Sequence, residues 1–162
     1  MAVIRIGITG HQSLSEEVRE FTSLRLPVLI PADKRHTIEC VSSLAGGSDQ
    51  LVAQYVLDVG GRLFAVIPSA AYESTFESPE ELRTYLYLLS RATEVEQLPF
   101  PEPSEAAFMA AGRRVVDSSD WLLAIWDGKR PRGLGGTADV VAYAEQRGKR
   151  VEVVWPEGAR RR

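Results

Sequence analysis

The stretch WLLAIWDGKRPRGLGGTAD, residues 121–139, decides the fold. It begins with a continuous apolar run, 121–126, which is typical of a strand covered on both faces of a parallel sheet. A glycine-rich loop follows over 127–136, and residues 137–147 are predicted to form a helix. This order of strand, glycine loop and helix is typical of α/β proteins that bind ligands at the carboxyl ends of parallel strands.

The same alternation runs through the rest of the chain. A capping-box spacing of Ser13 and Glu16 predicts a first helix, which should end before Pro27 or Pro31. Strands are predicted at residues 3–8, 37–44, 62–67, 93–98, 121–126 and 149–155, with helices between them. The pattern predicts a single-domain, Rossmann-like, doubly wound and mostly parallel sheet of about six strands, with helices on both faces. Residues 1–157 form this domain, and 158–162 form a basic C-terminal tail.

Composition excludes several classes of protein. The 162 residues suit one domain, and a net charge of −3 gives no general attraction to nucleic acid or anionic lipid. The single cysteine, Cys40, excludes an internal disulfide, and the two histidines form no zinc motif. No apolar run is long enough to span a membrane, and the first residues lack the layout of a signal peptide. We therefore expect a cytoplasmic protein with no metal, no cofactor and no membrane contact.

Three predicted strand ends lead into loops of glycine and small polar residues. They are Gly10-His11, Gly46-Gly47-Ser48-Asp49 and the loop 133–137, which contains Gly135, Gly136 and Thr137. Glycine lets a ligand approach the backbone, and the first N–H groups of a helix favour an anion. Each loop alone could be a simple tight turn. Because all lie at one end of a parallel sheet, we favour a phosphate site, to which the hydroxyls of Ser48 and Thr137 could donate.

Longer segments resemble a known superfamily. Residues 44–53, LAGGSDQLVA, and 60–68, GGRLFAVIP, resemble the SLOG superfamily of Rossmann-like domains. This superfamily includes the DNA-processing protein DprA, the "lonely guy" (LOG) phosphoribohydrolases and nucleotide-sensing domains. Residues 117–128 and 135–139 are similar to those hydrolases and to the nucleoside deoxyribosyltransferases. The resemblance implies binding of a nucleotide or a nucleotide-sugar.

The resemblance also implies roles for particular residues. In the hydrolases, glycines matching Gly46, Gly47, Gly135 and Gly136 hold the phosphate together with the hydroxyl matching Thr137. A helix arginine assists there; Arg113 is the nearest match, and Arg114 is its neighbour. A catalytic glutamate stands three residues after the matching threonine, where this chain has Val140. Valine cannot stabilise a sugar cation, so Asp139 is the substitute carboxylate that an enzyme would need.

Other residues have two readings each. His11 could donate to a phosphate or make local loop hydrogen bonds. Asp127, followed by Gly128, could accept from ribose hydroxyls or cap its own loop. Asp49 is better explained as stabilising the helix start than as a catalyst.

The connection after the third predicted strand offers further candidates. Tyr72 could stack on a nucleobase, although packing of the loop is the simpler explanation. Arg83 could reach a phosphate or pair with Glu80. Four apolar residues of the helix after Ser78 are predicted to form its buried face and could also support a homodimer; they are Leu82, Tyr85, Leu86 and Leu89.

Three functions follow from these residues. The first is binding or sensing of a nucleotide or nucleotide-derived ligand through the glycine loops. The second is an N-glycosidase, either a nucleoside 5′-monophosphate phosphoribohydrolase or a deoxyribosyltransferase-like enzyme, that uses Asp139 and Arg113. The third is binding of single-stranded DNA, against which the acidic balance and the lack of mixed basic and aromatic residues argue.

Overall fold

The computed structural model describes residues 2–130 and 136–160. Within them the chain forms six strands, five α-helices and one short 3-10 helix, in the predicted alternation. In chain order these are β1 (Ala2–Gly10), α1 (Glu16–Leu29), β2 (His36–Ser42), α2 (Ser48–Asp58), β3 (Arg62–Ile67), η1 (Tyr72–Thr75), α3 (Pro79–Arg91), β4 (Glu94–Gln97), α4 (Glu105–Asp117), β5 (Trp121–Ile125), α5 (Thr137–Gln146) and β6 (Arg150–Val154). The α/β fold class is therefore confirmed.

The strands form one parallel sheet in the order β4-β3-β2-β1-β5-β6. The chain moves outward from β1 to β4 and then returns to place β5 on the other side of β1. The boundary between β1 and β5 is thus the topological switch point, where open sheets of this kind bind ligands. It also places the carboxyl ends of β2, β1 and β5 next to one another.

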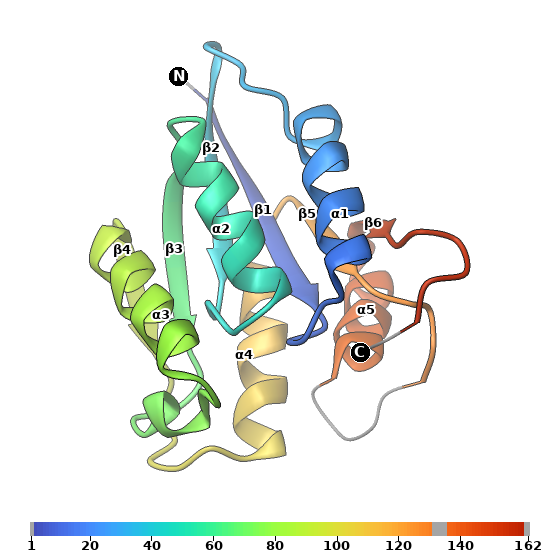
Figure 1. Ribbon diagram of the computed structural model, residues 1–162. Helices are drawn as coiled ribbons and strands as arrows, with labels where there is room; N and C mark the ends of the chain where they lie inside the picture. The colour runs from blue at the N-terminus through green and yellow to red at the C-terminus, as the bar shows by residue number, and fades with distance from the viewer. Residues whose placement is uncertain (1, 131–135, 161–162) are drawn as a thin grey trace.

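Helices cover both faces of the sheet. Figure 1 shows α1, α2 and α3 side by side over one face, where they bury Val18, Val52 and Leu88. On the opposite face α4 and α5 pack around Val115 and Val140. A central strand covered on both sides needs apolar residues on both, which explains the continuous apolar run of β5, buried along its whole length.

The first helix begins later than its sequence suggests. Its N-cap is Ser15, whose Oγ accepts a hydrogen bond from the Val18 N–H at 3.3 Å, so the predicted cap at Ser13 is wrong. Leu14 is 1% exposed and enters the core before the helix starts, which delays the first turn. The helix continues through Pro27 and ends before Pro31.

Two other local predictions also need correction. The second strand ends at Ser42 rather than at Leu44, because Leu44 has a left-handed φ of 58° that leaves the extended conformation. Leu86 was predicted to be buried but is 43% exposed, whereas Leu88 is fully buried. Leu88 lies three residues after buried Tyr85 and so shares its helix face.

Within the described ranges, no helix has the length and apolar character needed to cross a membrane.

Candidate functional site

The exit of β1 joins the two loops that flank it. The His11 N–H donates to the Ile125 carbonyl of β5 at 3.1 Å. On the other side, the His11 carbonyl accepts from the N–H of Ser48 at 3.1 Å and from its Oγ at 2.7 Å. The start of α2 and the end of β5 therefore lie on either side of the β1 exit, as the sequence argument required.

Two glycines allow this close approach. A Cβ at Gly10 would lie 2.8 Å from the Ile125 carbonyl oxygen and would collide with the Ser48 side chain. Gly47 has a φ of 73°, and its Cβ would lie 2.7 Å from the His11 carbonyl oxygen. Both positions need glycine because backbones and side chains meet there.

The His11 side chain contacts residues that follow β5 and β6. Its Nε2 accepts a hydrogen bond from the Asp127 N–H at 3.3 Å and lies 3.3 Å from Asp127 Oδ1. Its ring also meets Trp155 edge-on, with centroids 5.3 Å apart. Asp127 Oδ1 accepts in turn from the Lys129 N–H at 3.0 Å. His11 and Asp127 thus both make local hydrogen bonds, which was one of the two roles expected for each of them from the sequence.

A buried carboxyl group supports the loop before α2. Asp49 is 8% exposed, and its Oδ2 accepts from the Ala45 N–H at 3.2 Å. Burial raises the pKa of Asp49 to about 7, although hydrogen bonds from Ala45 and Ser42 oppose the shift. Asp49 therefore holds the loop from beneath instead of facing the solvent.

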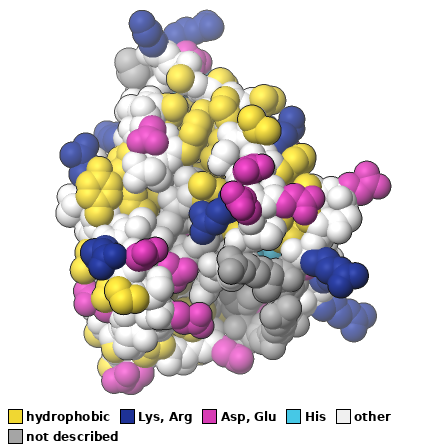
Figure 2. Space-filling view, in the orientation of Figure 1, with side chains coloured by type: hydrophobic (Ala, Val, Ile, Leu, Met, Phe, Trp, Pro, Cys, Tyr) yellow, Lys and Arg dark blue, Asp and Glu magenta, His cyan; other side chains and the backbone are white. Residues whose placement is uncertain are grey.

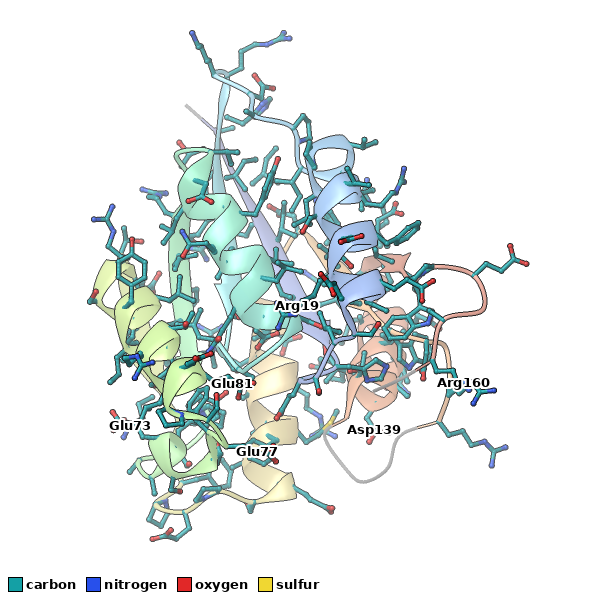
Figure 3. The ribbon with its side chains drawn as sticks, viewed as in Figure 1. Arg19, Glu73, Glu77, Glu81, Asp139 and Arg160 are labelled. Carbon is teal, nitrogen blue, oxygen red and sulfur yellow. The ribbon has the colours of Figure 1, made fainter. Side chains whose placement is uncertain are left out.

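Two charged residues that the sequence did not single out lie at this end of the sheet. The Glu81 carboxylate sits directly against Gly46, since a Cβ there would be 2.7 Å from its Cδ and Oε2. Figure 3 shows Arg19 extending from α1 towards the start of α2. Neither residue lies in a loop motif, so only spatial proximity reveals them.

The start of α5 provides the second loop. Gly136 is its N-cap with an ordinary φ of −72° and without a side-chain cap, and Thr137 is 9% exposed. Asp139 lies in the first turn (Figure 3). Val140 is 3% exposed and faces the core, where it meets the Cα of Gly112 on α4. The position of the hydrolases' glutamate therefore points away from the loops. Gly135 lies outside the described residues.

The predicted arginines make contacts with other side chains. Arg113 is stacked over the ring of Tyr143, 5.5 Å from its centroid, about two turns along α5 from its start. Arg114 Nε pairs with Glu96 at 2.6 Å. Arg83 is exposed on α3. The structure describes both Arg83 and Glu80, and no ion pair joins them.

The aromatic candidate is part of the core. Tyr72 is 4% exposed and packs edge-on against Phe76, Tyr85 and Phe108. Burial, followed by the nearby Asp49, raises the pKa of Tyr72. Its ring has no free face for a nucleobase in this conformation. Gly128 lies beyond β5, and a Cβ added to it would meet open space. Among the described residues, no cluster of three His, Cys, Asp or Glu could hold a metal ion.

Solved structures of known proteins share this architecture. DNA processing protein A (DprA) from Streptococcus pneumoniae matches 93% of this chain at 19% identity and a TM-score of 0.69. DprA from Helicobacter pylori, described for its single-stranded DNA binding mode, matches 93% at 17% identity and a TM-score of 0.64. TM1055, a structural genomics target, matches 91% at 17% identity and a TM-score of 0.56 and is covered over 72% of its own length.

The chain spans 50% of the Streptococcus DprA chain and 64% of the Helicobacter one. No family model matches the sequence, and a search of curated proteins found no match. At these identities the likeness establishes the fold alone, a Rossmann-like α/β domain.

Proposed function

We propose that this SLOG-type domain binds a nucleotide or nucleotide-derived ligand at the carboxyl end of its sheet. The observation that supports the proposal is the hydrogen bonding of His11, which joins the start of α2 and the end of β5 on the two sides of the β1 exit. Gly136 carries no side chain over the start of α5, and helix N-termini favour an anion. The switch point between β1 and β5 is where this architecture binds ligands.

The test is thermal unfolding with a panel of nucleoside mono-, di- and triphosphates. A ligand at 100 times its Kd should stabilise the fold by about 2.7 kcal/mol. Gly136→Asp should abolish this stabilisation, because it places a carboxylate at the start of α5. Gly136→Ser is the matched control, since serine also caps a helix but carries no charge. A panel without any shift would refute the proposal.

The enzymatic alternative is hydrolysis of a nucleotide bound at the same site. Asp139 lies in the first turn of α5 and could stabilise a sugar cation while water replaces the base. Chromatography of the incubated nucleotides would detect free base. Base release that is lost in Asp139→Ala would assign an N-glycosidase, whereas intact nucleotide with a thermal shift supports binding alone.

Single-stranded DNA is a second candidate ligand, which the Helicobacter DprA match favours. The charge distribution argues against it, because acidic side chains lie among the basic ones on the face shown in Figure 2. The net charge is −3. Salt-sensitive binding of a labelled oligonucleotide would establish this function, since neutralised phosphates make affinity fall with salt.

A further inference from the structure

The glycine loop before α2 uses several of its own hydrogen-bond donors. The N–H and Oγ of Ser48 both donate to the His11 carbonyl. The Gln50 N–H donates to the Ala45 carbonyl at 3.2 Å, and the Ala45 N–H donates to Asp49. These are donors that an incoming phosphate would need at a helix N-terminus.

The Glu81 carboxylate already occupies the open side of this loop. A Cβ on Gly46 would lie 2.7–2.8 Å from both of its oxygens and from Cδ, so the whole carboxylate is in contact with the glycine. Both backbone groups of Glu81 are fixed as well. Its N–H donates to the Ser78 N-cap at 3.1 Å, and its carbonyl accepts from Gln50 Nε2 at 3.0 Å.

In the described part of the chain, no basic side chain pairs with this carboxylate. Over residues 2–130 and 136–160, no Lys, Arg or His nitrogen lies within 4.0 Å of Glu81. A phosphate placed on Gly46 would meet a like charge at contact distance. A sugar hydroxyl would instead meet an acceptor, since an ionised carboxylate accepts hydrogen bonds through both oxygens.

The start of α5 differs from the start of α2 in its hydroxyl group. Both helices begin at a glycine N-cap without a side-chain hydrogen bond, Gly47 in α2 and Gly136 in α5. Thr137 is nine-tenths buried, and its hydroxyl has no hydrogen-bond partner in the described part of the chain. An anion at the start of α5 can therefore accept a hydrogen bond from Thr137. The corresponding hydroxyl in α2, that of Ser48, already donates to His11.

We propose that Glu81 reserves the α2 loop for a hydroxyl-bearing part of the ligand, such as a ribose diol, and directs the anionic part to the start of α5. This inference rests on the proposed function and deepens it. It also departs from the resemblance to the hydrolases, which implies that Gly46 and Gly47 hold phosphate. Glu81 is thus a specificity-determining residue.

The test compares adenosine 5′-monophosphate with its 2′,3′-dideoxy analogue by calorimetric titration of the wild type and Glu81→Gln. We expect the wild type to bind the ribonucleotide about tenfold more tightly, because a site built to accept a hydroxyl rejects a ligand without it. Glu81→Gln should reduce this preference to about twofold. It should also bind inorganic pyrophosphate more tightly than the wild type does, because the repelling charge is gone.

Glu80→Gln is the matched control, since it removes the same charge from the same helix turn at an exposed position. It should keep the ribose preference. Equal wild-type affinity for the two monophosphates would overturn this inference and leave the proposed function standing. If neither monophosphate binds and the nucleotide panel gives no thermal shift, both proposals fall.

Discussion

The backbone N–H of Asp127 donates to Nε2 of His11 at 3.3 Å and thereby joins the ends of β5 and β1. Because Nε2 is the acceptor, the neutral ring carries its proton on Nδ1 in this arrangement. The nearby Oδ1 of Asp127, also at 3.3 Å, offers a different partner to the protonated ring. The contact between His11 and Asp127 therefore holds the exits of β1 and β5 together.

Removing the His11 ring should weaken the connection between the exits of β1 and β5. His11→Ala leaves the Asp127 N–H without its acceptor and removes the edge-on contact with Trp155. We expect the free energy of unfolding in urea to fall by about 2–3 kcal/mol. His36→Ala is the control, because that ring is 37% exposed and contacts Asp33 at the surface. An equal loss in both variants would contradict the role assigned to His11.

Two glycines with a similar positive φ should respond differently to alanine. Gly47 has a φ of 73°, and its Cβ would lie 2.7 Å from the His11 carbonyl oxygen, so Gly47→Ala combines strain with a collision. Gly128 has a φ of 80° and no atom within 4 Å of its Cβ, so Gly128→Ala carries the strain alone. We expect losses of about 3 kcal/mol or more and about 1 kcal/mol, respectively. Chemical denaturation would measure both, and similar losses would show that the collision is relieved.

The buried Asp49 should make stability depend on pH. Its pKa rises from 3.8 to about 7 on folding, so below about pH 4 both states hold the proton. Between pH 4 and 7 only the folded state keeps it, and stability therefore falls as the pH rises, by about 4 kcal/mol in total. Above pH 7 this contribution stays constant.

Asp49→Asn should remove this decline, because an amide does not titrate while its oxygen can still accept from Ala45. Urea midpoints at intervals from pH 4.5 to 8 would show the difference. A wild-type decline that persists unchanged in the variant would assign it to another group.

An ion pair within the sheet should matter more than one on its surface. Glu39 is 3% exposed and lies 2.7 Å from Arg5 Nε and 3.6 Å from Arg62 Nε. Glu39→Gln should lower the free energy of unfolding by about 2 kcal/mol, with the loss moderated because both arginines reach solvent. The exposed pair of Arg150 and Glu152 gives the control, since Glu152→Gln should change stability by less than about 0.5 kcal/mol. Calorimetric unfolding of both variants at low salt would decide.

Much of the fold follows from local patterns in the sequence. Ser78 and Ser104 cap helices as serine does when acidic residues follow, and both caps form hydrogen bonds. The apolar run at 121–126 predicted a doubly covered strand because no solvent-facing residue interrupts it. The cap at Ser13 was wrong because burial of Leu14, a tertiary effect, decided where the helix starts.

The site was less predictable, because it depends on contacts between distant residues. The sequence indicated that the loops at Gly46 and Gly136 would lie at one end of the sheet. It gave no sign that Glu81 would cover Gly46, since the two are far apart in the chain. Arg113 was assigned by similarity to a helix arginine, but the packing of α4 against α5 places it over Tyr143.

The outermost strands of the sheet have a consequence for self-association. β4 and β6 each leave one row of backbone groups unpaired within the sheet, and each exposes a valine, Val95 at 52% and Val153 at 51%. Charged neighbours accompany these valines, Glu94 and Glu96 in β4 and Glu152 in β6. Two copies meeting border to border through β4 would bring carboxylates together, which opposes growth of the sheet into fibrils.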